Sequence, residues 1–389
     1  MTGYASALSI HPNSFEAAAE CAGQILEQLG GERPDLAVVF ASAHHLDRFA
    51  DLSAGLRKLL EADVLIGATT SAVAGGHQEV EDGPGLSVFA ADWGGGHARG
   101  IALDSAPTGD GFRIDGWPDD VRPDGTLLLL ADPMSFPVAD FLHISNENFA
   151  GLQVIGGVAS TPPRGFTMPE MSGPVRCVLA LDDSVRERGA VGVVLDPSIP
   201  VRTVVSQGCR PIGQPFTITS AHRNVIQELA GRPPLARLRD IIGSLDEADH
   251  DLVRHGLHVG IVIDEHASDF GRGDFLVRNL VGADESTGSL AIGEIVDVGQ
   301  TVQFHVRDRA SADADLAALL ADVDGRAALL FTCTGRGKHL FGTADHDAQL
   351  LQDRLGSAAI AGMFCSGEIG PIGGQTFLHG YTASVAVFG

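Results

Sequence analysis

The chain has 389 residues, and its 50 acidic against 26 basic residues give a net charge of −24. A surface this acidic repels nucleic-acid phosphates and anionic lipid headgroups, so we exclude both as expected partners. The length is comfortable for two domains, and a hydrophobic content of 44% is enough for a large core.

The N-terminal residues contain no basic segment followed by an apolar run. No segment approaches the roughly 18 uninterrupted apolar residues of a membrane span. The five cysteines are scattered and form no C-x-x-C pair (Cys21, Cys177, Cys209, Cys333 and Cys365). We therefore expect a reduced, cytoplasmic protein without a signal peptide or a zinc site.

Three continuous apolar runs predict buried strands that are covered on both faces: Leu36–Ser42, Leu127–Pro133 and Ala328–Thr334. Each is followed by a helical pattern, a second short apolar run, a Gly/Pro-rich loop and a third strand-like run. The second runs are Val64–Ala72, Gln153–Thr161 and Ala359–Gly367, and the third are Leu86–Asp92, Arg176–Asp182 and Ala383–Gly389.

The spacing between these runs is similar in all three copies when Gly67, Gly156 and Gly362 are aligned. This regularity indicates a β-α-β-loop-β unit that is used three times. Its strand–helix–strand part predicts a parallel pair joined by a right-handed crossover. The expected fold class is α/β, with α+β as the open alternative, and two β-rich lobes built partly from these pseudo-repeats.

The segments between the copies differ from the repeat. Gly189–Gly208 predicts short β segments, and His255–Asp308 predicts a β meander with glycine-containing turns. Gly231–Ile242 reads as a helix that begins with prolines, and Asp313–Val323 as a further helix. We place the domain boundary before the first of these helices, which predicts domains at residues 1–230 and 231–389.

The loop after the middle strand of each repeat is the expected ligand position, because ligands of parallel sheets bind beyond the carboxyl ends of the strands. Small residues at these points let a ligand approach backbone N–H groups, although they also serve simply as tight strand exits. The polar candidates in the three loops are Thr69, Thr70, Ser71, His77, Glu79 and Glu81, then Ser160, Thr161 and Arg164, then Cys365, Ser366, Glu368 and His379.

Two cysteines are candidates for a nucleophile. Cys209 precedes Arg210, which favours a thiolate, and Cys365 lies at a strand exit. The stretch GMFCSG lacks the G-x-S-x-G spacing of a nucleophile elbow, so a buried or ligand-lining role is favoured over catalysis for both. The basic, Gly-rich Thr334–Lys338 is either an anion site or an exposed turn.

Several of these stretches together resemble the FIST family of bacterial signal-transduction modules, which is also found in some eukaryotic F-box proteins. The resemblance to the N-terminal FIST pattern lies in PDLAVVFASAHH, IGATTSAVAGGHQEVEDGPGLSVFAA, QVIGGVAS and VSQGCRPIGQPFTIT. The C-terminal pattern is matched by FLVRNLVGADESTGSLAIGEIVDVGQTVQFHVRD, CTGRGKHLFG and IAGMFCSGEIGPIGGQTFLHGYTASVAVFG.

The resemblance implies a sensory protein that binds a small, amino-acid-like or other polar ligand without catalysis and signals through a separate protein. We expect one pocket between the two FIST halves, in which Arg210 or Arg336 pairs a carboxylate and Glu368 takes an ammonium. The full set of expected ligand-binding residues is Cys209, Arg210, Arg336, Cys365, Glu368, Ser366, Thr70 and Ser160.

Three other functions stay open at this point. One is a haem-binding nitric oxide sensor with His379 as an axial ligand, although a core position is favoured for that histidine and no cofactor is the first expectation. The second is a thiol-dependent hydrolase or transferase that uses Cys209 or Cys365. The third is an interaction scaffold, by analogy with the F-box members.

Overall fold

The computed structural model describes residues 3–109, 111–118, 120–161, 176–267, 269–271 and 273–389. The candidate Arg164 therefore lies outside the described residues. The chain divides into two compact units, the first made of residues 1–205, 317–378 and 382–389 and the second of residues 206–316 and 379–381. The predicted boundary between residues 230 and 231 lies inside unit 2 and does not coincide with the division into compact units. The two sequence domains stay a prediction.

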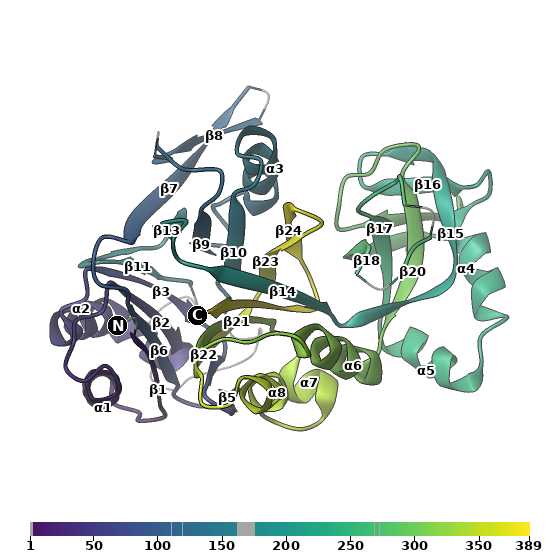
Figure 1. Ribbon diagram of the computed structural model, residues 1–389. Coiled ribbons are helices and arrows are strands. Elements are labelled where there is room, and N and C mark those ends of the chain that lie inside the picture. Colours follow the sequence, from purple (N-terminus) through teal and green to yellow (C-terminus); the bar gives the residue numbers. More distant parts are fainter. Residues whose placement is uncertain (1–2, 110, 119, 162–175, 268, 272) are drawn as a thin grey trace. The chain divides into compact units, whose positions relative to one another are not determined.

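Unit 1 contains three mixed sheets (Figure 1). The first has the strand order β1 (Gly3–Ser9), β6 (Leu86–Asp92), β2 (Leu36–Ser42), β3 (Val64–Thr70), β11 (Leu179–Leu181) and β12 (Ser184–Arg186). The second has the order β24 (Gln375–His379), β23 (Gly367–Ile372), β10 (Gln153–Val158), β9 (Thr126–Ala131), β13 (Ala190–Leu195), β7 (Ala98–Thr108) and β8 (Gly111–Asp115). The third has the order β14 (Val201–Gln207), β25 (Thr382–Phe388), β21 (Ala327–Cys333), β22 (Ala359–Cys365), β4 (Val73–Gly75) and β5 (Gln78–Val80).

The three predicted repeats form the centres of these sheets. In each, the first and middle strands are parallel neighbours, as β2 and β3, β9 and β10, and β21 and β22. The helices of unit 1 are α1 (Ser14–Gln28), α2 (Phe49–Leu60), α3 (Val138–Asn148), α7 (Gly337–Phe341) and α8 (His346–Leu355), with the 3-10 helix η1 (Ala43–Arg48) before α2. The predicted three-repeat α/β organisation is therefore confirmed.

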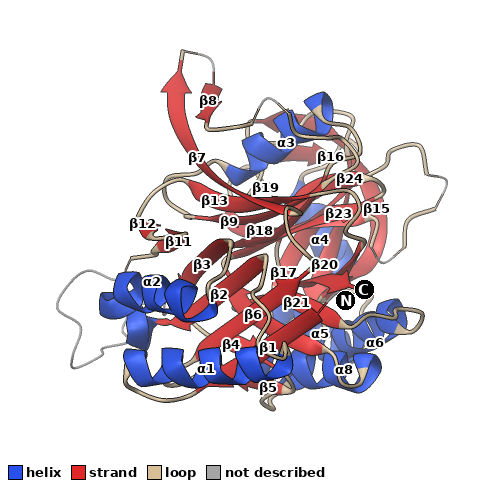
Figure 2. Ribbon diagram, turned by 60° about the vertical axis from the view of Figure 1, so that its left-hand side comes forward, coloured by secondary structure: helices blue, strands red, loops and turns tan. Residues whose placement is uncertain are grey.

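The strands of each repeat bury both faces, which explains their continuous apolar sequences. Alternate residues of β2 point in opposite directions: Leu36, Val38 and Phe40 enter a core that all three sheets share, whereas Ala37 and Val39 pack against α1 and α2. Figure 2 shows these two helices along one face of the first sheet. The outer face of the second sheet is covered by α3 in the same way.

A short hairpin leaves each repeat after its middle strand and joins the sheet of another repeat. The hairpin β4–β5 follows β3 but pairs with β22, and the hairpin β23–β24 follows β22 but pairs with β10. The hairpin β11–β12 follows β10 but pairs with β3, which completes the cycle. The three repeats are thus interlocked by exchanged hairpins within one compact unit.

This exchange corrects one sequence prediction. The apolar segment Arg176–Asp182, predicted as the third strand of the second repeat, contributes β11 to the first sheet instead. The third-strand position beside β9 is taken by β13, which pairs with β9 antiparallel, as β6 pairs with β2 and β25 with β21. Both segments are short and apolar, so the sequence alone did not distinguish them.

Unit 2 is a closed barrel with the strand order β15 (Cys209–His222), β16 (Val225–Leu229), β19 (Ser289–Ile292), β18 (Phe275–Asp284), β17 (Leu257–Val262) and β20 (Thr301–Arg307). The predicted meander is confirmed for β17, β18 and β19, which are successive antiparallel neighbours, whereas β20 pairs with β17 and β15 instead of β19. The accompanying helices are α4 (Pro234–Ile242), α5 (Glu247–His255) and α6 (Arg309–Leu320), whose last turn belongs to unit 1.

Candidate functional site

The carboxyl ends of the three middle strands meet in unit 1. Ser71, Ser160 and Ser366 are each the fourth residue after the aligned glycine of their repeat, Gly67, Gly156 and Gly362. The Ser160 hydroxyl lies 3.0 Å from the Thr70 hydroxyl and 2.6 Å from the carbonyl oxygen of Phe364, and it accepts the Ser71 N–H at 3.0 Å. Residues from all three repeats are thus joined by one hydrogen-bond network.

A pocket of about 570 Å³, which we call the strand-exit pocket, opens beside this network. Its hydroxyl groups come from all three repeats: Ser71, Thr161, Thr334 and Ser366. Its ionisable side chains are His44, Glu81, Asp82, Lys338 and His339, and its remaining lining is Ala43, Ala72, Gly83 and Phe364. The pocket therefore combines several hydrogen-bonding groups with charges of both signs.

The charged part of the rim is a contact between the loop after β5 and helix α7. The Glu81 carboxylate accepts the Lys338 N–H at 2.9 Å, and Lys338 Nζ lies 3.1 Å from Asp82 Oδ2. Burial raises the pKa of Glu81, while the hydrogen bond to Asp82 raises the pKa of Lys338. The ammonium of Lys338 consequently lies beside the Asp82 carboxylate, and the Glu81 carboxylate is held by the backbone N–H of the same lysine.

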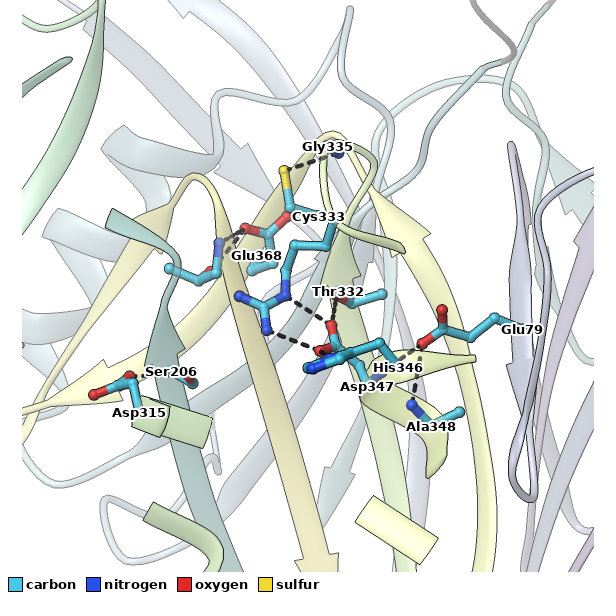
Figure 3. Close-up of polar contacts among 12 residues, drawn as sticks. Glu79, Ser206, Asp315, Thr332, Cys333, Gly335, His346, Asp347, Ala348 and Glu368 are labelled. Atoms are coloured by element: carbon cyan, nitrogen blue, oxygen red, sulfur yellow. Dashed lines mark hydrogen bonds and ion pairs between the residues drawn. The ribbon is translucent and has the colours of Figure 1, made fainter. Parts of the chain in front are cut away.

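A buried ionic cluster lies around the start of α8 (Figure 3). The Arg336 guanidinium binds Asp347, whose carboxylate also accepts the hydroxyl of Thr332 at 2.7 Å. Glu79 Oε1 accepts the N–H groups of Asp347 and Ala348, each at 3.0 Å. Burial raises the pKa of Glu79 to about 8, and the neighbouring Asp347 contributes to this shift.

The expected residue Arg336 is completely buried and lies outside the lining of the strand-exit pocket. Glu368 is also completely buried, and its Oε2 accepts the N–H and hydroxyl of Thr382 at 3.1 and 2.7 Å. Burial raises the pKa of Glu368 to about 8. The proposed roles of Arg336 and Glu368 toward a ligand stay predictions, but both side chains already have internal partners.

Cys365 ends β22 with its side chain in the shared core, and it has no exposed surface. Burial, together with the nearby Glu368 and Cys333, raises the pKa of the Cys365 thiol well above its usual value. A thiol in this environment is protonated at neutral pH and is a poor nucleophile. Ser366 lines the strand-exit pocket, whereas Thr70 and Ser160 lie almost fully buried in the hydrogen-bond network described above.

The candidates Cys209 and Arg210 begin strand β15 in unit 2. Cys209 is 1% exposed, and the Arg210 guanidinium is bound by Asp308 at 2.9 Å and by Asp249. His379 is also buried and belongs to unit 2. The structure therefore brings Ser366, Thr70 and Ser160 together in unit 1 and places Cys209 and Arg210 in the other unit.

The ligand-binding set predicted from the sequence lacks Lys338, Asp82, His44 and His339, and Glu81 appears only among the polar candidates of the strand-exit loops. Lys338 belongs to the basic stretch Thr334–Lys338, which the sequence indicates as either an anion site or an exposed turn, so a signal for it is present. Among the described residues, no group of three His, Cys, Asp or Glu side chains is arranged to hold a metal ion. The described helices also include none that is long and apolar enough to cross a membrane.

Comparison with known proteins identifies the family. Residues 35–232 match the FIST N domain and residues 234–371 match the FIST C domain, so the chain belongs to the FIST family. FIST domains are generally sensory signal-transduction domains. The protein is 45% identical over 383 residues to "Uncharacterized protein Mb0898c" of Mycobacterium bovis, covering 97% of this chain and 96% of that protein. It is 44% identical over 387 residues to "Uncharacterized protein Rv0628c" of Mycobacterium tuberculosis, covering 98% of both chains.

Proposed function

We propose that this protein is a sensory protein that binds a small zwitterionic molecule of the amino-acid type in the strand-exit pocket. The observation that carries the proposal is the juxtaposition of Lys338 with Glu81 and Asp82 in the lining of a pocket that also contains hydroxyl groups. A ligand carboxylate would be bound by Lys338 Nζ and a ligand ammonium by the Glu81 carboxylate.

The size and composition of the pocket support this proposal. Its volume of about 570 Å³ is within the range of about 300–1,000 Å³ typical of small-molecule sites. Four hydroxyl groups and two histidines supply further hydrogen bonds for the polar part of a ligand, and Phe364 offers an apolar surface for a side chain. Because the lining comes from all three repeats, a ligand there would be in contact with segments from both FIST sequence domains.

A binding function is favoured over thiol catalysis because of the surroundings of the cysteines. Cys365 is completely buried with a raised pKa, and Cys209 is 1% exposed. Neither therefore presents an accessible thiolate, which a cysteine nucleophile requires. An absorption spectrum of the purified protein tests the haem-sensor alternative separately. A haem band would favour that alternative over amino-acid binding.

The chain offers an internal control for the binding experiment, because Lys58 and Lys338 are its two lysines. Lys58 is exposed on α2, in a different part of the surface from the strand-exit pocket. The protein is acetylated with a limiting amine-reactive reagent in the presence of each common amino acid, and both lysines are quantified by mass spectrometry. A bound amino acid is expected to reduce labelling of Lys338 relative to Lys58.

Two variants test the roles of Glu81 and Lys338 separately. Glu81→Gln is expected to abolish the protection of Lys338 while leaving the labelling of Lys58 unchanged, because the ammonium of the ligand loses its charged partner. Lys338→Met is expected to remove binding as seen by isothermal titration calorimetry with the protecting amino acid. If no amino acid changes the ratio of labelling of the two lysines, the proposed ligand class is wrong.

A further inference from the structure

Strand β8 forms the outer edge of the second sheet in unit 1. It pairs with β7 from Gly111↔Thr108 to Asp115↔Asp104, and among the described residues no strand lies on its other side. Four of its five residues are exposed, and the hairpin of β7 and β8 projects beyond the rest of the sheet (Figures 1 and 2). An exposed edge strand is a template for pairing with another chain.

The pairing with β7 indicates which backbone groups face outward. Phe112 lies opposite Pro107, which has no N–H to donate. We infer that this pair is of the non-hydrogen-bonded kind, so that the N–H and C=O groups of Phe112 and Ile114 point away from β7. The outer edge of β8 therefore has two residues whose backbone groups are available for pairing, Phe112 and the half-buried Ile114.

An apolar groove of about 340 Å³ lies beside this edge, between β8 and α3. Its aromatic and aliphatic lining is Phe112, Ile114, Trp117, Phe141, Ile144 and Phe149. Phe112 is 44% exposed and Ile144 is 37% exposed, although both are large hydrophobic residues. Contiguous exposed apolar surface beside a groove is a feature of interaction sites.

The charges on β8 identify the partner that fits. Arg113 and Asp115 lie on one face of the strand and bind each other through two hydrogen bonds of 2.8 and 2.9 Å. If a second copy pairs antiparallel about a two-fold axis at Ile114, each Arg113 lies opposite the Asp115 of the other copy. On the other face, each Phe112 would lie just beyond the last strand residue of the other copy, beside Gly116, which has no side chain and ends the strand with a φ of 91°. The strand is thus complementary to itself in charge and in shape.

From this arrangement we propose that two copies of this protein associate through antiparallel pairing of their β8 strands, with Phe112 of each copy packed at the apolar groove of the other. This inference goes beyond the ligand site and is independent of it. A two-fold homodimer is the commonest oligomer of soluble proteins. Two copies that each carry a net charge of −24 repel one another as a whole, so the opposite charges of Arg113 and Asp115 favour contact at β8 and in this register.

The test is sedimentation velocity of the full chain over a range of concentrations. The wild type is expected to show a monomer–dimer equilibrium, and Arg113→Asp or Asp115→Arg alone to weaken dimerisation at least tenfold because like charges then face each other. An equimolar mixture of the two variants is expected to restore a dimer, since each carries the charge that the other needs. Restoration by mixing also shows that neither variant is misfolded.

A matched control uses a second exposed pair with the same spacing. Arg122 binds Asp124 with distances of 3.0 and 2.9 Å but does not belong to a strand. Arg122→Asp is therefore expected to dimerise as the wild type does. A wild type that stays monomeric at all concentrations would overturn the proposal, as would a dimer that Arg113→Asp leaves unchanged or a mixture of variants that stays monomeric.

Discussion

The guanidinium of Arg336 donates two hydrogen bonds of 2.7 and 2.8 Å to the carboxylate of Asp347, and neither side chain has any exposed surface. Burial alone would raise the pKa of Asp347, but the adjacent guanidinium outweighs this effect and holds that pKa below its usual range. Since α8 begins beside Asp347 and Arg336 immediately precedes α7, the pair fixes both helices near the strand-exit pocket.

Removing one member of this pair is expected to destabilise unit 1 strongly. Asp347→Ala leaves an uncompensated buried charge on Arg336, with an expected loss of about 3–5 kcal/mol in the free energy of unfolding. Urea unfolding followed by tryptophan fluorescence measures this effect, because Trp93 and Trp117 both lie in unit 1. Asp124→Ala, which breaks an exposed Arg–Asp pair, serves as the control and is expected to leave the transition unchanged.

Glu368 is expected to make the stability of unit 1 fall as pH rises. Its folded pKa is about 8, whereas an unfolded glutamate titrates near pH 4.3, so between these values the folded state holds a proton that the unfolded state has lost. The free energy of unfolding must then decrease with pH across that window, by at most about 1.4 kcal/mol per pH unit for one proton. Glu79 contributes in the same direction, since its pKa is also about 8.

The variant Glu368→Gln isolates this contribution, because glutamine resembles the neutral carboxyl and does not titrate. We expect the free energy of unfolding of the variant to fall less steeply between pH 5 and pH 8 than that of the wild type. Asp347 does not interfere in this window, because a depressed pKa affects stability only at acid pH, below its ordinary value. Equal slopes for the two proteins would contradict the buried, protonated state of Glu368.

The sequence was sufficient to predict the three repeats because burial on both faces leaves a local signature. The runs around Val38, Leu128 and Leu329 are continuous and apolar, and each supplies residues to the shared core. The exchange of hairpins was not predictable in this way. The strand β11 follows the second repeat in sequence but pairs with β3, and nothing in a short apolar segment encodes which sheet it will join.

The sequence predicts that a candidate site lies at the ends of the middle strands, but it does not predict which charged side chains line it. Ser366 was expected from its place after a middle strand, and it does line the strand-exit pocket. Arg336 and Glu368 are expected from their place in the family motifs at strand exits and from their charge, but their burial depends on partners such as Asp347 and Thr382, which only the folded chain brings near. Charge in a sequence identifies side chains that need a partner, and it does not show whether the partner is a ligand or the protein itself.

The aligned glycines have a common physical role that predicts the effect of replacing them. A Cβ added at Gly67, Gly156 or Gly362 would meet the backbone carbonyl oxygen of the neighbouring first strand more closely than real Cβ atoms approach. The oxygens belong to Val39, Leu129 and Leu330, which occupy equivalent places in the three repeats. An added methyl group at any of these glycines can therefore be accommodated only if the backbone moves.

We expect Gly362→Ala to reduce the free energy of unfolding of unit 1 by about 1–3 kcal/mol through this overpacking. Gly23→Ala is the matched control, because Gly23 lies in α1 with no atom within 4 Å of the added methyl group. That change is expected to stabilise the helix by about 0.5–1 kcal/mol. If urea unfolding shows the same sign for both variants, the glycines do not have the role assigned to them.

Ser160 is expected to connect stability to ligand binding, because its hydroxyl joins the strand exits beside the pocket. Ser160→Ala removes the acceptor of the Ser71 N–H and a donor to the Phe364 carbonyl oxygen, with an expected loss of about 1–3 kcal/mol in the free energy of unfolding. Ser71 and Phe364 both line the pocket, so the amino-acid protection of Lys338 from acetylation should weaken in the same variant. Ser184→Ala, at an exposed hydroxyl on β12, should change neither measurement. A stable Ser160→Ala protein with full protection of Lys338 would show that the network and the pocket are independent.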